Sequence, residues 1–171
     1  MNITIRHAEP NDYEALHVVF SGQQVVWGTL QIPFSSVERR RKRLIEVREG
    51  RHLLVACDDD VVIGYLSLTI DSSPRRRHVA SIGMAIHDNW QGKGVGSVLM
   101  TNALDVADNW LNIIRIELQV WIDNKPAISL YNKFGFTVEG THHFYVFRNG
   151  DYVSAHTMAR IKRSHFEKDT K

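Results

Sequence analysis

The sequence predicts an α+β fold: a mixed, mostly antiparallel sheet of about seven strands flanked by about four helices. Strand-like and helix-like patterns follow one another in the order β-α-α-β-β-β-α-β-α-β-β. Polar turns of hairpin length, Asp58-Asp59-Asp60 and Arg148-Asn149-Gly150-Asp151, join neighbouring strand patterns. The 171 residues suit one domain, which we expect to span residues 3–162, with a charged tail at 163–171.

The elements are expected in this order along the chain. Ile3 and Ile5 alternate with polar residues and indicate the first strand, and Pro10 opens a helix. Residues 21–37 are expected to be irregular, and a very basic helix follows at 38–49. Later strands are expected at 52–57, 61–70, 79–86, 114–122, 136–138 with 144–147, and 152–161. Later helices are expected after a glycine-rich turn at 92–96 and over 126–134, where Gly135 ends the helix.

Composition limits the function classes. The net charge of +2 does not by itself imply nucleic-acid binding, and glutamates flank the basic run 39–43, which favours a solvated helix face. Cys57 is the only cysteine, which excludes an internal disulfide, and it lies in an apolar run typical of a buried strand. No apolar run approaches the roughly 20 residues of a membrane span, and the N-terminus alternates like a strand rather than a signal peptide. We therefore expect a cytoplasmic protein that binds neither nucleic acid nor membrane.

The most informative segment runs from Met84 to Gly96. An apolar strand leads into glycines at 92, 94 and 96, and an apolar helix pattern follows at once. Free N–H groups at a helix start, with the helix dipole behind them, favour a bound anion. A P-loop is excluded because Gly94 follows Gly92-Lys93, and a Rossmann motif is excluded because the glycine spacing is G-x-G-x-G.

The remaining pattern, Q-x-x-G-x-G at Gln91, Gly94 and Gly96, resembles the pyrophosphate loop of the GCN5-related N-acetyltransferases, which bind acetyl-CoA. The element order is also similar to that family over about residues 3–162. The resemblance implies that acetyl-CoA is the acetyl donor. The residues that it places at the coenzyme are Met84, Ala85, Ile86, Gln91, Gly92, Lys93, Gly94, Val95 and Gly96. Lys93 is either a cation near the phosphates or a solvated loop lysine.

A second motif resembles the family's N-x-x-A-x-x-x-Y-x-x-x-G-F and begins at Asn124. Asn124 stands at a helix start, where asparagine caps free N–H groups, and the resemblance implies that it also binds the coenzyme arm. Tyr131 lies two helical turns further on. The resemblance implies that Tyr131 lies beside the coenzyme sulfur and is the general acid that protonates the departing thiolate. The alternative is a core tyrosine that packs beside Phe134 and Phe136.

The general base is less well defined, because the strand before the glycine turn carries no acidic residue. Glu117 on the next strand is the nearest carboxylate in the sequence, and His78 is the nearest imidazole. Each also has a structural interpretation, as a strand glutamate paired with arginine or as a turn histidine. The nine histidines show no H-E-x-x-H motif, so no metal site is expected.

The amine substrate is expected against the segment 21–37, which has aromatic residues and no acidic residue. An apolar amino acid suits that composition better than a polyamine, which needs several carboxylates. The candidate substrate residues are Trp27, Thr29, Leu30, Gln31 and Phe34. The alternative is a loop that tucks its rings into the core.

The sequence is also similar to a bacterial branch of the family that acetylates L-amino acids, for example at Val26–Pro33 and Arg75–Ala80. It departs from that branch at Ser81, where aspartate is expected. Val138–Thr141 and Asn149–Tyr152 are shared with spermidine acetyltransferases. A polyamine or antibiotic acetyltransferase and a non-catalytic acetyl-CoA-binding protein therefore remain open, and a homodimer is expected by analogy alone.

Overall fold

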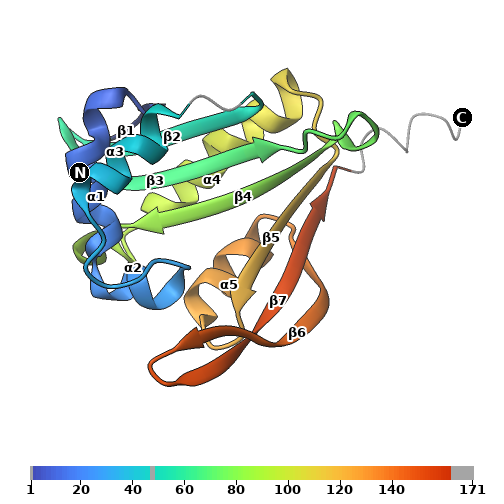
Figure 1. Cartoon of the computed structure of the whole chain (residues 1–171). Helices are drawn as coiled ribbons and strands as arrows, with labels where there is room; N and C mark the ends of the chain where they lie inside the picture. The colour runs from blue at the N-terminus through green and yellow to red at the C-terminus, as the bar shows by residue number, and fades with distance from the viewer. Residues whose placement is uncertain (1, 47–48, 163–171) are drawn as a thin grey trace, which may run out of the picture. The chain divides into compact units, whose positions relative to one another are not determined.

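Seven strands form one sheet in the order β1-β2-β3-β4-β5-β7-β6 (Figure 1). The structure is a computed structural model that describes residues 2–46 and 49–162. Its contacts divide the chain into a first unit, Met1–Thr69 with Gly83–Ala103, and a second unit, Ile70–Ile82 with Leu104–Lys171. Strand β4 (Val79–Ile86) begins in the second unit and ends in the first.

The first unit contains three antiparallel strands and most of the helices. Its elements are β1 (Ile3–His7), α1 (Tyr13–Ser21), α2 (Gln23–Gly28), α3 (Val37–Ile45), β2 (Arg51–Asp58), β3 (Val61–Ile70), the end of β4, and most of α4 (Val95–Asp105). Strand β2 pairs with β1 on one side and β3 on the other. The β2–β3 turn is tight because Asp58 pairs with Val61, and Asp59 takes a φ of +50°.

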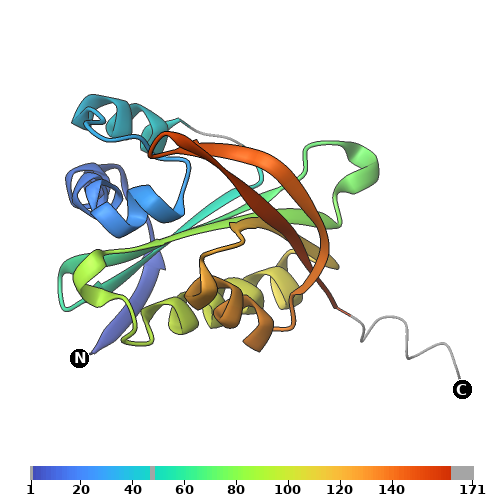
Figure 2. The same cartoon turned by 90° about the horizontal axis from the view of Figure 1, so that it is seen from below.

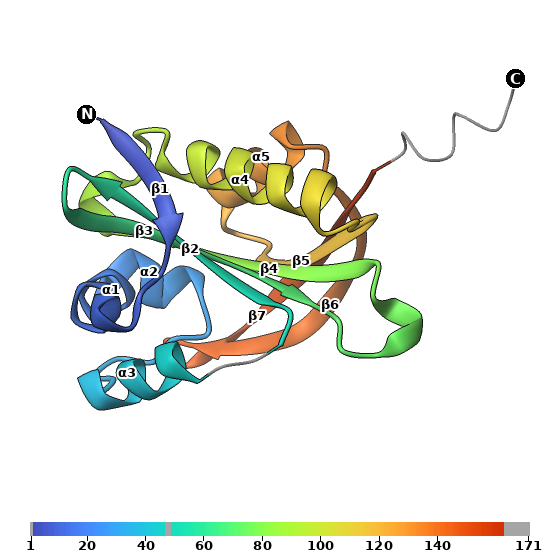
Figure 3. The same cartoon turned by 90° about the horizontal axis from the view of Figure 1, so that it is seen from above.

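Helices cover both faces of the sheet in the first unit (Figure 3). Leu16, Val19 and Phe20 of α1 belong to the same buried cluster as Val55 of β2 and Tyr65 of β3. On the other face, α4 crosses β3 closely at Gly64. A Cβ atom at that position would lie 3.0 Å from a methyl carbon of Leu99 and 3.1 Å from one of Val95. Gly64 therefore allows the helix after the glycine turn to approach the sheet.

The second unit is built on a mixed sheet. Its elements are the start of β4, a π-helical turn (Val106–Trp110), β5 (Arg115–Trp121), α5 (Lys125–Lys133), β6 (Thr137–Arg148) and β7 (Asp151–Ile161). Strand β5 is parallel to β4 over Val79–Ser81 and antiparallel to β7. Strands β6 and β7 form a long curved hairpin (Figure 2). Its turn places Asn149 at φ +51° and Gly150 at φ +84°, as the Asn-Gly signal predicts.

The ends of α5 follow the signals in the sequence. The side chain of Asn124 accepts a hydrogen bond from the Ala127 N–H at 3.3 Å. At the other end Gly135 adopts φ +83°. The Phe136 N–H donates to the Tyr131 carbonyl at 3.1 Å, and the Gly135 N–H donates to the Asn132 carbonyl at 3.0 Å. These two bonds form a Schellman motif, which satisfies carbonyls left free at the helix end.

The α+β class, the seven strands and the element order are confirmed, with three corrections. The segment 21–37 is not wholly irregular, because it contains α2, which makes five α-helices among the described residues. The predicted strand pieces 136–138 and 144–147 belong to one strand, β6, with two register shifts. Helix α3 ends at Ile45, earlier than predicted. Positions 47–48 and the predicted tail 163–171 lie outside the described residues.

Two further expectations concern single residues. Cys57 is buried in β2, as predicted, with 2% of its surface exposed. Arg40 contradicts the expectation of a wholly solvated basic helix face, because it is buried. Within the described part of the chain, no helix is long and apolar enough to cross a membrane.

Candidate active site

The glycine turn between β4 and α4 has the geometry of an anion site. Gly92 and Gly94 adopt φ of +71° and +87°, and a Cβ atom at either would meet nothing within 4 Å. Glycine is therefore needed there for its conformation rather than for lack of space. The Gly94 carbonyl accepts hydrogen bonds from the N–H groups of Ser97 and Val98 at 3.0 and 3.2 Å, so the N–H groups before Ser97 precede the helical pattern. Gly96 is the second residue of α4.

Side chains brace this turn from within the first unit. Gln91 donates from Nε2 to the Ile86 carbonyl at 3.1 Å and to the Asp88 carboxylate at 3.4 Å. Lys93 Nζ lies 5.1 Å from the centroid of the Trp90 ring. Gln91 therefore helps to hold the turn in shape, while Lys93 adds a positive charge to it.

Asp88 connects the turn to α2. Its carboxylate accepts hydrogen bonds from the Gln24 N–H at 3.0 Å and the Val25 N–H at 3.3 Å. These groups belong to the first turn of α2, so a residue 63 or 64 positions away supplies the cap that its own sequence lacks. This explains why the local sequence of α2 does not predict a helix.

The first unit also contains a cavity of about 250 Å³. Residues from α1, α3, β2, β3 and β4 and from the segment after α2 line it: Leu16, Phe20, Thr29, Gln31, Arg40, Arg43, Leu44, Arg51, Tyr65, Ser67, Gly83 and Met84. Three of these residues are arginines and none is acidic. The cavity thus combines an apolar wall with positive charge, which suits a small ligand that is apolar at one end and anionic at the other.

Arg40 is the buried member of this lining, with 9% of its surface exposed. Its guanidinium carbon lies 3.9 Å from the centroid of the Phe20 ring, and its Nη2 donates to Gln31 Oε1 at 2.8 Å. Its Nε is buried without a hydrogen-bond partner among the described residues. Burial, followed by the neighbouring charge of Arg43, lowers the pKa of Arg40.

The predicted substrate residues divide into two groups. Thr29 and Gln31 line the cavity, and Gln31 is held there by Arg40. Leu30 and Phe34 do not line it, and they are 68% and 106% exposed. The alternative that they fill the core is wrong, and their contact with the substrate stays a prediction. Trp27 lies at the end of α2, half-buried, and is not in the lining.

The arginines of the cavity are functional candidates that the sequence did not predict. Val37, Arg40 and Leu44 lie three and four residues apart, so they share one face of α3. Leu44 packs against the core cluster, whereas Val37 is 40% exposed, so the four-residue spacing of Arg40 and Leu44 is the signal that could have identified Arg40. Because Arg40 lies within the basic run 39–43, its sequence context indicates a solvated helix face.

Tyr131 lies in the second unit, on α5. Its ring is 5.8 Å from that of Phe136, and only 9% of the residue is exposed. Burial raises the pKa of Tyr131 to about 12. The phenol therefore keeps its proton at neutral pH and can act as a hydrogen-bond donor.

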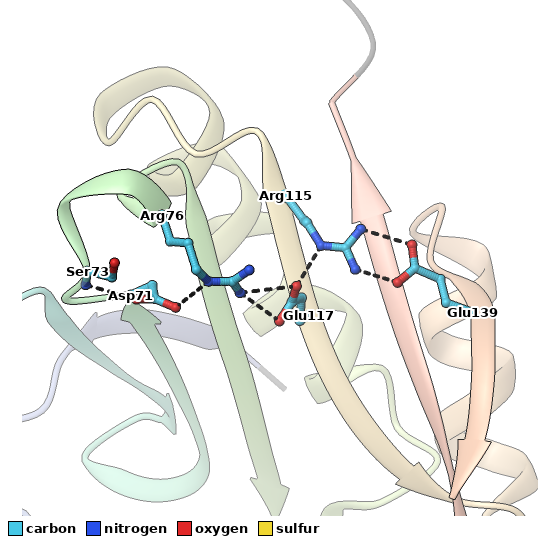
Figure 4. Close-up of polar contacts among 6 residues, drawn as sticks. All are labelled: Asp71, Ser73, Arg76, Arg115, Glu117 and Glu139. Atoms are coloured by element: carbon cyan, nitrogen blue, oxygen red, sulfur yellow. Dashed lines mark hydrogen bonds and ion pairs between the residues drawn. The ribbon is translucent and has the colours of Figure 1, made fainter.

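Glu117 belongs to a chain of ion pairs in the second unit (Figure 4). Its carboxylate lies 2.6 Å from Arg115 Nε and 3.4 Å from Arg76 Nη2. Arg76 also pairs with Asp71 at 2.7 Å, and Arg115 also pairs with Glu139. The hydrogen bonds to Glu139 and then to Glu117 raise the pKa of Arg115. This geometry favours the structural interpretation of Glu117, because two guanidinium groups already hold its carboxylate.

His78 has a backbone role. Its carbonyl accepts hydrogen bonds from the N–H groups of Ile114 and Arg115 at 2.9 and 3.1 Å. Its side chain is exposed at the start of β4. Among the residues that the structure describes, no group of three or more His, Cys, Asp or Glu side chains could hold a metal ion.

Comparison with known proteins gives one consistent result. Residues 21–136 match the model of the acetyltransferase (GNAT) family. The chain is 46% identical over 160 residues to an L-amino acid N-acetyltransferase of Escherichia coli, covering 94% of this chain and 98% of that one. It is 27% identical over 162 residues to an E. coli spermidine N(1)-acetyltransferase, covering 92% and 84%. A ribosomal-protein-alanine N-acetyltransferase from Brucella melitensis has the same fold, with a TM-score of 0.81, 25% identity and coverage of 93% and 99%.

Proposed function

Because the chain belongs to the GNAT family of acetyltransferases, we propose that it acetylates the α-amine of an L-amino acid with an apolar side chain. Acetyl-CoA, the donor in this family, supplies the acetyl group as an activated thioester. The single observation that carries the choice of acceptor is the cavity of the first unit, which has three arginines and no carboxylate. The name of the 46% identical relative points to the same substrate class.

The turn from Gln91 to Gly96 fits a bound diphosphate. Gly92 and Gly94 hold left-handed conformations that expose backbone N–H groups, and α4 begins directly behind them. Lys93 adds a cation, and Asn124 is proposed to reach the coenzyme arm as the family motif implies. The backbone groups of Met84, Ala85 and Ile86 are proposed to pair with the pantetheine chain and to polarise the thioester carbonyl.

The cavity favours an amino acid over a polyamine for an electrostatic reason. A polyamine carries several positive charges, and three guanidinium groups would repel them. An amino acid brings a carboxylate, which the arginines attract. The same positive charges disfavour the ammonium form of the amine, so the cavity itself promotes the neutral nucleophile.

Tyr131 is proposed to donate a hydrogen bond to the departing thiolate. An ordinary thiol has a pKa of about 8.5. With the pKa of Tyr131 near 12, full proton transfer to such a thiolate would cost about 5 kcal/mol. A strong hydrogen bond that forms as the carbon–sulfur bond breaks avoids that cost, because charge develops on sulfur only at that moment.

An amine panel tests the proposed function. Release of the free thiol is measured with L-phenylalanine, L-methionine, spermidine and an aminoglycoside, each with acetyl-CoA. We expect turnover with the two amino acids and little with spermidine. Preferential turnover of spermidine or the aminoglycoside would favour the polyamine or antibiotic enzyme. Coenzyme binding by calorimetry without turnover of any amine would favour a non-catalytic acetyl-CoA-binding protein.

We also propose a cytoplasmic homodimer. The β6–β7 hairpin exposes aromatic side chains, with Phe144 78%, Phe147 63% and Tyr152 58% exposed. Strand β6 is also an edge of the sheet. A second copy of the chain would cover this patch. Light scattering should give twice the chain mass for the wild type and a smaller mass for Phe147→Ser, whereas a wild-type monomer would contradict the proposal.

A further inference from the structure

We propose that Arg40 receives the carboxylate of the acceptor, so that the protein selects amines bearing a nearby anionic group and rejects otherwise identical neutral amines. The inference rests on the proposed function, because it assigns a subsite to the proposed amino acid. It goes further by naming one residue of α3 as the determinant of specificity. The substrates that this residue selects are amines that also carry a negative charge.

The first support is the missing counterion of Arg40. Arginine is rarely buried without a paired acid. Arg40 is buried, and no described carboxylate forms an ion pair with it. Of the neighbouring groups, Arg43 acts most strongly on its charge; Tyr65 acts in the opposite direction, and Arg39 adds a further charge of the same sign. A site that keeps a buried, unpaired cation beside two more cations is prepared for an anion that comes from outside the chain.

The second support is the arrangement of its donors. A guanidinium group has five N–H donors in one plane. The Gln31 side chain uses Nη2, and the Phe20 ring covers one face of the group. The Nε–H donor remains buried without an acceptor among the described residues. Gln31 and Phe20 thus fix the plane of the guanidinium and leave donors for a carboxylate, which matches such a fork geometrically.

The other arginines of the cavity are less suited to this role. Arg43 is exposed. Arg51 Nη1 donates to the Arg43 carbonyl at 2.9 Å, so its guanidinium is partly used. Both add positive charge near the subsite, but Arg40 alone among the three is buried. Leu16, Phe20 and Leu44 complete the lining and offer an apolar surface to the amino acid side chain.

The test compares three acceptors that differ only at one end: L-phenylalanine, L-phenylalaninamide and phenethylamine. The wild type should favour the acid over the amide by about 100-fold in kcat/KM, since the neutral amide leaves the charge unpaired. Arg40→Gln should raise KM for the acid at least about 30-fold, with a smaller effect on kcat, and should reduce the preference for the acid to a few-fold. The preference of Arg40→Lys for the acid should lie between those of the wild type and Arg40→Gln. Lysine keeps the positive charge but lacks the two parallel N–H donors of the guanidinium.

Arg41→Gln is the matched control. Arg41 is the next residue of α3, its side chain is 52% exposed, and it pairs with Glu38 at 3.7 Å. This variant should keep wild-type kinetics with all three acceptors. The calorimetric affinity for coenzyme A should be unchanged in each variant, which separates loss of the subsite from loss of the fold.

The possible failures can be distinguished. Equal wild-type turnover of acid and amide would overturn the inference while leaving the acetyltransferase in place. An undiminished preference for the acid in Arg40→Gln, or in Arg40→Lys if the glutamine variant does not fold, would also overturn it and limit Arg40 to packing α3 against α1. Absence of turnover with any amino acid would instead overturn the proposed function, and the subsite with it.

Discussion

A Cβ atom on Gly22 would lie 2.6 Å from Oδ1 of Asp88. Gly22 has an ordinary φ of −58°, so glycine is required there by the proximity of the carboxylate and not by backbone conformation. Asp88 comes just before the glycine turn, and Gly22 comes just before α2, which leads to Thr29 and Gln31. One carboxylate thus joins the glycine turn to the start of α2 and the segment that follows it.

The first prediction concerns this pair. Gly22→Ala should lower the free energy of unfolding by about 1–3 kcal/mol, because the new methyl group overlaps the Asp88 carboxylate. In an Asp88→Ala background the same change should cost at least about 1 kcal/mol less, since the overlap is gone. Urea unfolding of the four proteins measures this. Strictly additive effects would mean that the two residues are not coupled.

The second prediction tests the anion site. Gly94→Ala should weaken coenzyme A binding at least tenfold by calorimetry, because alanine resists φ +87° and the N–H groups after it would turn away. Gly150→Ala in the β6–β7 turn is the control, since its φ of +84° and open surroundings match those of Gly94. Each change should cost roughly 1–2 kcal/mol of stability. An equal loss of affinity in both variants would argue against a specific role for the glycine turn.

The third prediction concerns Tyr131. With a pKa raised to about 12 by burial, the folded protein holds this proton more tightly than the unfolded chain, whose tyrosine has a pKa near 10. The stabilisation is complete below pH 10 and is lost as pH rises through 12. The wild type should therefore lose up to about 2.7 kcal/mol over this range relative to Tyr131→Phe.

The same substitution tests catalysis. Tyr131→Phe should lower kcat by about 100-fold or more at neutral pH while coenzyme affinity stays the same. A wild-type kcat with an unchanged pH profile would remove Tyr131 from the mechanism and leave it as a core residue beside Phe136.

The fourth prediction concerns Glu117. If its carboxylate serves to join Arg115 and Arg76, Glu117→Gln should keep kcat within about threefold of the wild type. A fall of 100-fold, together with loss of the acidic limb of the pH–rate profile, would identify Glu117 as the general base instead.

The parts of the fold that the sequence predicts are those that depend on residues close together in the sequence. Gly135 and the Asn149-Gly150 turn take left-handed conformations because their own residue types allow it, and a reader of the sequence can expect this. Asn124 caps α5 for a similar local reason. These signals need no knowledge of distant contacts.

The parts that were missed depend on distant residues. Helix α2 is capped by Asp88, and Arg40 is buried because Phe20 of α1 covers it and Gln31 accepts its hydrogen bond. The cap on α2 leaves no mark in the neighbouring sequence, and the helical spacing of Arg40 and Leu44 is easily overlooked within a basic run that indicates solvent rather than a cavity. The left-handed glycines of the turn could be expected because phosphate cradles require particular residue types in a fixed spacing, and their role at a phosphate stays a prediction.

The C-terminal end of α5 limits which substitutions this sequence can accept. The Tyr131 carbonyl accepts the Phe136 N–H, and that bond needs Gly135 in its left-handed form. Gly135 therefore fixes the backbone path at the end of the helix that carries Tyr131. A saturation library is expected to show strong intolerance at Gly135, because residues with a Cβ atom disfavour φ +83°.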